Sequence, residues 1–197
     1  MTLRHAGKID NKGENMTNNL HPDISKILVS EEEIKEIVKN IADKINQDFK
    51  DEEIIVVVIL RGSLIFASDL IRQLNMPVTV EFMQASSYGS GTESSGFIKI
   101  KRDLDVDIKD KNVLIIEDII DSGNTLYRLK SVLEERKPKT CNICAFLDKP
   151  DRRTTEVDVK YTGKVIPNEF AIGYGLDYNE HYRNLPYVGV LKREIYE

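Results

Sequence analysis

Two adjacent carboxylates, Glu117 and Asp118, directly follow four apolar residues that are typical of a buried strand, Val113 to Ile116. A run of small polar residues, Asp121 to Thr125, then precedes a helical pattern with apolar residues at 126, 129, 132 and 133. Because the first amides of a helix have no acceptor within it, this run can bind an anion such as a phosphate. We expect the two carboxylates where strands of a parallel sheet end, at the edge that binds ligands. Carboxylates beside a phosphate-binding loop indicate a sugar phosphate, which carries a phosphate and free hydroxyls.

Strand and helix patterns alternate along the rest of the chain. Ser30 and Glu33 form a capping box before a helical pattern with one apolar face. Strand patterns follow at 54–60, 78–82 and 140–147, and a further helical pattern runs from Ser63 to Leu74. This order predicts an α/β fold with a central, mostly parallel, twisted sheet flanked by helices. Residues 86–96 hold five serines and three glycines, so we expect a mobile loop there.

Length and composition set limits on the class of protein. The 197 residues suffice for one globular domain, and a net charge of -5 argues against a broad nucleic-acid surface. The longest apolar run, 54–60, is too short to cross a membrane, and residues 1–20 lack the apolar stretch of a signal peptide. We therefore expect a cytoplasmic protein without nucleic-acid or membrane partners. A disordered arm is expected over residues 1–20 and a single domain over residues 21–197.

Cys141 and Cys144 form a C-x-x-C pair, which in other contexts binds zinc or carries out redox chemistry. The pair falls in the predicted strand 140–147, where side chains three residues apart point to opposite faces. We therefore expect two reduced thiols without special chemistry.

Several motifs together resemble the type I phosphoribosyltransferases. The run from Glu117 to Gly123 is similar to this family's signature for 5-phosphoribosyl-1-pyrophosphate (PRPP), and specifically to that of its 6-oxopurine branch. The resemblance covers residues 23–196 and implies the type I phosphoribosyltransferase fold, with a small hood in which residues 157–182 join N-terminal residues. It also implies a homodimer or homotetramer. Further blocks match in order: Leu60-Arg61-Gly62-Ser63, Ser86-Ser87-Tyr88-Gly89, Leu147-Asp148-Lys149-Pro150, and Gly173-Tyr174-Gly175-Leu176-Asp177-Tyr178 with its continuation Tyr182 to Tyr187.

The reaction that the resemblance implies is displacement of pyrophosphate from PRPP by a nitrogen of hypoxanthine or guanine, which gives IMP or GMP. Glu117 and Asp118 would bind the ribose hydroxyls, directly or through a metal. Asp121 is the expected general base, which takes the N7 proton of the purine as N9 attacks. An aspartate here is also a good N-cap for the following helix, so that role stays open beside the catalytic one. The expected PRPP-binding loop consists of Asp121, Ser122, Gly123, Asn124 and Thr125.

On the base side, the resemblance implies that Lys149 donates to the purine O6, that Phe170 stacks on the purine plane, and that the backbone around Ala171 meets its N1/N2 edge. Asp177 is expected beside the purine. Adenine presents an amino group where the lysine donates, so two donors would face each other and adenine would be rejected.

On the pyrophosphate side, the resemblance implies a Mg²⁺ ion held by Asp177 with Glu117 and Asp118, which neutralises the leaving group. Arg183 and the Arg61-Gly62 loop would bind pyrophosphate. The family uses a non-proline cis peptide in this loop and more often carries lysine at position 61. Ser87 and Tyr88 would close over the site during turnover.

Two alternatives remain open at this point. A regulator with this fold could sense PRPP and bind RNA or DNA, although it should show a basic face, and the chain has a pI near 5.4. A related enzyme could act on adenine, orotate or xanthine. The residues do not rank guanine against hypoxanthine, because Lys149 can serve the O6 of both.

Overall fold

The structure, a computed structural model, describes residues 20–87 and 98–197. The arm expected over residues 1–20, apart from Leu20, and most of the loop expected at 86–96 lie outside the described residues and stay predictions. Within the described ranges, no helix is long and apolar enough to cross a membrane.

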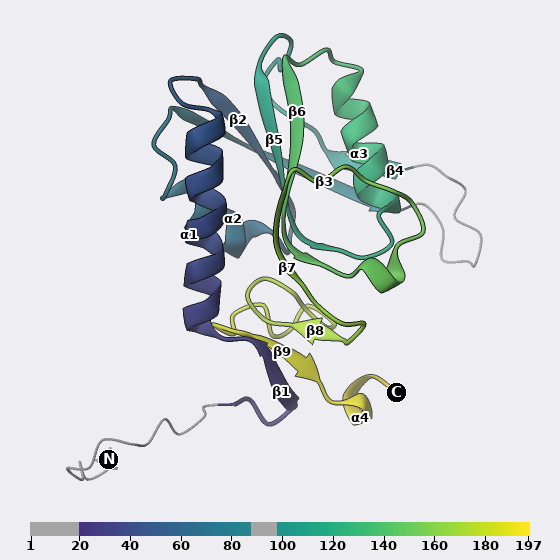
Figure 1. The fold of residues 1–197 in the computed structure, drawn as a ribbon. Coiled ribbons are helices and arrows are strands. Elements are labelled where there is room, and N and C mark those ends of the chain that lie inside the picture. Colours follow the sequence, from purple (N-terminus) through teal and green to yellow (C-terminus); the bar gives the residue numbers. More distant parts are fainter. Residues whose placement is uncertain (1–19, 88–97) are drawn as a thin grey trace, which may run out of the picture.

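A six-stranded sheet forms the centre of the molecule, in the order β4-β3-β2-β5-β6-β7 (Figure 1). Neighbouring strands from β3 to β7 are parallel, and only the edge strand β4 is antiparallel. This confirms the expected mostly parallel sheet. Strand β3 extends two residues into the expected loop, because Ser86 and Ser87 pair with β4. The strands are β2 (Ile54–Ile59), β3 (Val78–Ser87), β4 (Ile98–Arg102), β5 (Asn112–Ile120), β6 (Thr140–Asp148) and β7 (Tyr161–Val165).

Helices cover both faces of this sheet. Alternate residues of β2 belong to different cores: Ile54, Val56 and Val58 pack with α1 (Glu31–Asp48) and α2 (Leu64–Ile71). The intervening β2 residues pack with α3 (Asn124–Glu134) on the opposite face (Figure 1). Ser30 Oγ accepts a hydrogen bond from Glu33 N at 3.2 Å, as the capping box predicts. Helix α2 ends at Ile71, three residues earlier than the apolar pattern suggests.

A second, three-stranded sheet lies below the main one and forms the hood (Figure 1). Its antiparallel strands lie in the order β1 (Ile24–Val29), β9 (Val188–Leu191) and β8 (Ala171–Ile172). In the chain, β9 is followed by the short helix α4 (Arg193–Tyr196). The hood bounds expected from the resemblance, 157–182, are wrong at both ends. Residues 161–165 add strand β7 to the main sheet instead, and β9 contributes a hood strand beyond residue 182.

The two cysteines are free, as expected. Both lie on β6, and they belong to different cores, because Cys144 packs with the α1 side and Cys141 with the α3 side. Burial raises the pKa of the Cys141 thiol to about 11, which keeps it protonated and unreactive. Among the described residues, no group of three or more potential ligands is arranged to hold a metal by itself.

Candidate active site

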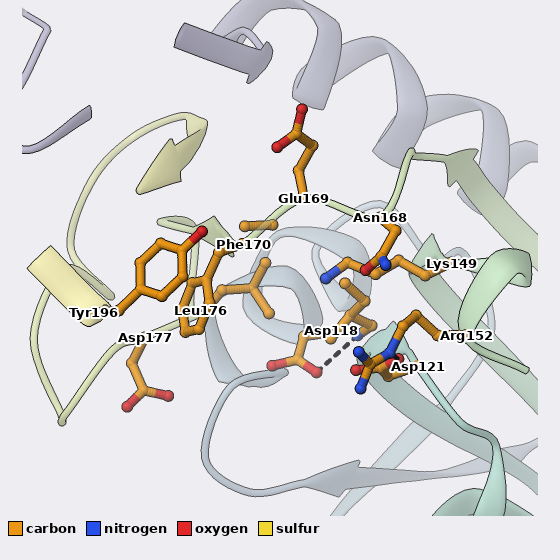
Figure 2. Close-up of a pocket in the computed structure, with 12 residues that line it drawn as sticks. Asp118, Asp121, Lys149, Arg152, Asn168, Glu169, Phe170, Leu176, Asp177 and Tyr196 are labelled. Carbon is orange, nitrogen blue, oxygen red and sulfur yellow. Dashed lines mark hydrogen bonds and ion pairs between the residues drawn. The ribbon is translucent and has the colours of Figure 1, made fainter. Parts of the chain in front are cut away.

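A cavity of about 540 Å³ lies where the ends of β5 and β6 meet the hood (Figure 2). Six residues predicted from the sequence line it together: Asp118, Asp121, Lys149, Phe170, Ala171 and Asp177. Six others line it that the sequence reasoning did not single out for this site: Ile119, Arg152, Asn168, Glu169, Leu176 and Tyr196.

A smaller cavity of about 210 Å³ adjoins it at the start of α3. Its lining includes four residues of the predicted PRPP loop, namely Asp121, Ser122, Gly123 and Thr125. Gly123 has φ of +84°, and a Cβ at this position would lie 2.3 Å from Thr155 O, so only glycine fits. Tyr127 N donates to Gly123 O, the N-cap carbonyl of α3, at 2.9 Å, so the preceding amides are at the orphan end of the helix, as an anion site requires.

A neighbouring segment braces this loop. Ser122 O accepts hydrogen bonds from Thr154 N at 3.0 Å and from Thr155 N at 3.1 Å. Asn124 Nδ2 also donates to Thr154 Oγ1 at 3.2 Å. The segment that follows Lys149 therefore fixes the loop that we expect to bind phosphate. Sequence reasoning missed this contact because the two segments are about thirty residues apart and carry no motif that links them.

Glu117 and Asp118 lie inside β5 and not after its end, which corrects the sequence expectation. The strand continues to Ile120 because its pairing with β6 continues, with Glu117 opposite Ala145 and Ile120 opposite Asp148. Oε2 of Glu117 is buried and has no hydrogen-bond partner among the described residues. Burial, together with the neighbouring Asp118 carboxylate, raises the pKa of Glu117 well above its usual range.

Asp118 occupies a similarly unfavourable position. Burial raises its pKa to about 6, although its Oδ1 accepts a hydrogen bond from Ile119 N at 2.7 Å and the Arg183 charge acts in the opposite direction. The free protein thus holds two adjacent carboxylates that resist ionisation. Such groups are common where a protein binds a cation or a polar ligand.

Two glycine-containing loops stack above Asp118, the Gly62 loop against the carboxylate and the Gly175 loop against Gly62. A Cβ on Gly62 would lie 1.5 Å from Asp118 Oδ2, and a Cβ on Gly175 would lie 2.0 Å from Gly62 O. Gly175 also has φ of +102°. Both positions therefore require glycine, and the absence of side chains lets Gly62 approach the Asp118 carboxylate and lets Gly175 approach Gly62. The peptide between Leu60 and Arg61 is cis, as the resemblance implied.

The expected pyrophosphate-binding arginines converge on one acid. Arg61 Nη1 lies 2.7 Å and Arg183 Nη2 lies 3.2 Å from Glu180 Oε2. Arg183 Nη2 also lies 3.0 Å from Asp177 Oδ1, and Asp177 Oδ2 accepts a hydrogen bond from Glu180 N at 2.9 Å. Glu180 was not anticipated. It keeps the two cationic groups together in the free protein.

Lys149 and Asp121 lie on the other side of the cavity (Figure 2). Lys149 is buried, and this burial lowers the pKa of its ammonium, while the Asp121 charge acts in the opposite direction. Asp121 Oδ1 pairs with Arg152 Nε at 3.0 Å. The N-cap alternative for Asp121 is wrong, because Gly123 occupies the N-cap of α3 and no side chain caps it.

The sequence matches the phosphoribosyl transferase domain family over residues 25–179. The chain belongs to the phosphoribosyltransferase family. It is 47% identical over 177 residues to a hypoxanthine-guanine phosphoribosyltransferase of Staphylococcus epidermidis, with 90% of this chain and 99% of the relative covered. A Staphylococcus aureus protein of the same name is 45% identical over 177 residues, with the same coverage of 90% and 99%. A crystal structure of a hypoxanthine phosphoribosyltransferase from S. aureus matches with a TM-score of 0.88 at 44% identity, covering 93% of this chain and 100% of that one.

The architecture of this phosphoribosyltransferase is therefore the type I fold that the motifs implied. Only part of the predicted closing loop falls within the described residues. Ser87 lies at the end of β3, and Tyr88 lies outside the described residues, so closure over the site stays a prediction.

For some of the unanticipated residues of this phosphoribosyltransferase site, the sequence offered a weak indication. Ile119 and Leu176 lie inside the recognised motifs and were passed over because apolar residues there are also expected in a core. Arg152 follows Lys149 closely. Tyr196 gave no signal, because its place in the cavity depends on how the C-terminal segment folds back over the hood.

Proposed function

We propose that this phosphoribosyltransferase is a purine salvage enzyme that transfers the 5-phosphoribosyl group from PRPP to hypoxanthine or guanine, giving IMP or GMP and pyrophosphate. One observation carries the proposal: a single cavity joins the Lys149 ammonium, the Asp121 carboxylate and the Phe170 ring to Asp118. These are groups suited to a 6-oxopurine at one end and to ribose at the other. The names of the relatives from the two Staphylococcus species support the same substrate class.

The sugar phosphate would be held from two directions. The start of α3 and the hydroxyls of Ser122 and Thr125 bind the 5-phosphate in the smaller cavity. Glu117 and Asp118 accept hydrogen bonds from the ribose hydroxyls, which gives Glu117 Oε2 the partner it lacks in the free protein. Holding both reactants in one cavity converts a bimolecular step into an effectively unimolecular one.

Asp121 acts as the base for the purine. Its carboxylate accepts the N7 proton as N9 attacks the anomeric carbon, and the pyrophosphate oxygen leaves with the bonding electrons. Arg152 holds Asp121 in the free protein at 3.0 Å and must share it with the incoming base. A charge-assisted hydrogen bond from N7–H to Asp121 also orients the purine.

Lys149 selects the base. Its ammonium donates to O6 of hypoxanthine or guanine, and the same group rejects adenine, whose amino group is a donor. Phe170 stacks on the purine, and the backbone near Ala171 meets the N1/N2 edge. Lys149 is buried, so water cannot readily replace a missing partner. A base that offers no acceptor therefore leaves the ammonium without a hydrogen bond, which is costly.

Pyrophosphate would be released toward Arg61, Gly62 and Arg183. A Mg²⁺ ion fits the donor set, because it takes one or two carboxylates and completes its shell with substrate oxygens and water. One or two of Asp177, Glu117 and Asp118 would bind it, since the three do not form a metal site by themselves among the described residues. When bound, the ion would neutralise the charge that develops on the pyrophosphate. A cation would give Glu117 Oε2 a partner and would stabilise the ionised form of Asp118, whose pKa is raised by burial. A cytoplasmic homodimer or homotetramer is the expected working form.

Product analysis tests this function. The protein is incubated with PRPP and Mg²⁺ together with hypoxanthine, guanine, xanthine or adenine in turn, and the nucleotide formed is identified. IMP and GMP are expected, and AMP formation at a comparable rate would contradict the proposal.

Lys149→Gln tests the substrate class more closely. We expect kcat/KM for hypoxanthine and guanine to fall by about 1–3 kcal/mol of transition-state stabilisation, the contribution of a charged hydrogen bond. Adenine should gain relative ground, because the amide can present an acceptor. The matched control is Lys160→Gln, which removes a lysine that pairs with Asp48 on α1. An unchanged guanine-to-adenine ratio in Lys149→Gln would show that this lysine does not read O6.

A further inference from the structure

An aromatic ring from the C-terminal helix α4 stacks on the ring that we expect to contact the purine. The centroids of Phe170 and Tyr196 are 4.7 Å apart and their planes differ by 27°. Tyr178 meets Phe170 at 5.5 Å and 85°, nearly perpendicular. Both stacked rings line the large cavity, and in Figure 2 Tyr196 lies on the opposite side of Phe170 from Lys149 and Asp121.

The backbone fixes Tyr196 in this place. Leu191 N donates to the carbonyl oxygen of Phe170 itself at 2.9 Å, and the next amide, Lys192 N, donates to Asp23 O at 2.9 Å. The chain then turns into α4, where Ile195 N donates to Lys192 O at 3.1 Å. Ile195 and Tyr196 pack in the same hood cluster as Phe170. The stacked pair is therefore tied together through the backbone as well as through the rings.

Phe170 needs such support because its own element is small. It immediately precedes β8, which has only two residues, and its side chain is half-buried beside an open cavity. A phenyl ring in that position can rotate about the Cα–Cβ bond at little cost unless a neighbour fills one side. Stacking between aromatic rings is sensitive to their offset and tilt, so a ring free to rotate binds a planar ligand less well.

We propose that Tyr196 is a positioning residue for the purine: it fixes the plane of Phe170 and so sets the affinity for the base, with no part in binding PRPP. This inference rests on the proposed function, because it takes a purine as the ligand of Phe170. It places a determinant of base affinity in the C-terminal helix, outside every motif that carries the family resemblance.

The test compares Tyr196→Ala, Tyr196→Leu and Tyr196→Phe with the wild type, and deletion of Glu197 serves as the matched control because it shortens the same segment without touching the ring. We expect Tyr196→Ala to raise KM for hypoxanthine and guanine about 2- to 12-fold, the range that corresponds to the strength of aromatic pairs. KM for PRPP and kcat should stay within about twofold, as expected for a group that acts only on the base. Tyr196→Phe should restore the wild-type KM, since the ring is retained, and Tyr196→Leu should show the loss if Tyr196→Ala fails to fold.

A binding measurement separates this role from general loosening of the hood. By calorimetry, Tyr196→Ala should weaken GMP binding and leave ribose 5-phosphate binding unchanged, because only GMP carries the base. Equal loss for both ligands, an unchanged KM for the base, or a lower KM because Tyr196 blocks the base would each overturn the inference. A wild-type protein that forms neither IMP nor GMP would instead overturn the proposed function.

Discussion

Asp118 should make the free protein less stable as the pH rises. Its pKa in the folded protein is about 6 against an ordinary value of 3.8, so between these values the folded protein keeps a proton that the unfolded chain has lost. Well below pH 3.8 both states are protonated and the carboxyl group costs nothing. Above pH 6 both states are ionised, and the folded protein then carries a charge in a site that disfavours it.

The size of the effect follows from the two pKa values. A difference of this size corresponds to about 3 kcal/mol at roughly 1.4 kcal/mol for each pH unit. Because Asp118 is only half-buried, solvent will screen part of this, and we take roughly 1–3 kcal/mol. Asp118→Asn removes the charge, and the amide oxygen can still accept the hydrogen bond from Ile119 N. The variant should therefore exceed the wild type in stability by about 1–3 kcal/mol more at pH 7.5 than at pH 4, or about 2–12 °C in Tm.

Thermal and urea unfolding of both proteins across pH 4 to 8, without Mg²⁺ and without ligands, measures this difference directly. The exposed Asp105→Asn is the matched control, because Asp105 pairs only at the surface with Arg102, and its stability difference should stay within about 0.5 kcal/mol at every pH. A stability difference for Asp118→Asn that does not change with pH would refute the reasoning. It would mean that relaxation or water already solvates this carboxylate in the folded protein.

Three further substitutions test the remaining assignments. Asp121→Asn should fold normally and lower kcat about 10²- to 10⁴-fold with little change in PRPP affinity, and an unchanged single-turnover rate would exclude a role as base. Asp177→Asn should shift the Mg²⁺ dependence of activity to higher concentrations, whereas curves that superimpose on the wild type would exclude a metal role. Gly123→Ala should weaken ribose 5-phosphate binding measured by calorimetry, because its Cβ would lie 2.3 Å from Thr155 O and the loop would have to move; undiminished binding would show that the loop does not hold the phosphate.

The sequence predicts the central sheet well because a strand buried on both faces needs a continuous run of apolar residues, which is visible locally. The six buried residues of β2 are all apolar, and the five buried residues of α1 follow helical spacing. The motif from Asp121 to Thr125 is likewise predictable, because the small residues that form a tight turn before a helix are neighbours in the sequence. Each of these features depends on residues that are neighbours in the sequence.

The features that sequence reasoning missed depend on segments that are far apart in the chain. Nothing local distinguishes a strand that ends at Ile116 from one that continues through Glu117, because the continuation depends on pairing with β6. The hood joins β1 to β9 across most of the chain, so its bounds depend on tertiary pairing. Tyr196 enters the cavity for the same reason, since its segment is held by the backbone of Phe170 and Asp23.

The packing around Asp118 explains why the site carries an electrostatic cost in the free protein. Gly62 approaches its carboxylate so closely that no Cβ fits, and Gly175 in turn lies against the carbonyl of Gly62. This stack displaces water from Asp118, which raises its pKa, and it also brings two loops of the expected pyrophosphate site within reach of one sugar phosphate. A ligand that offers ribose hydroxyls or a cation to Asp118 and Glu117 would replace the lost hydration. Gly62, which packs against the Asp118 carboxylate, and Gly175, which packs against Gly62, would therefore also shape the proposed binding site, and substituting either one should stabilise neither the fold nor the ligand complex.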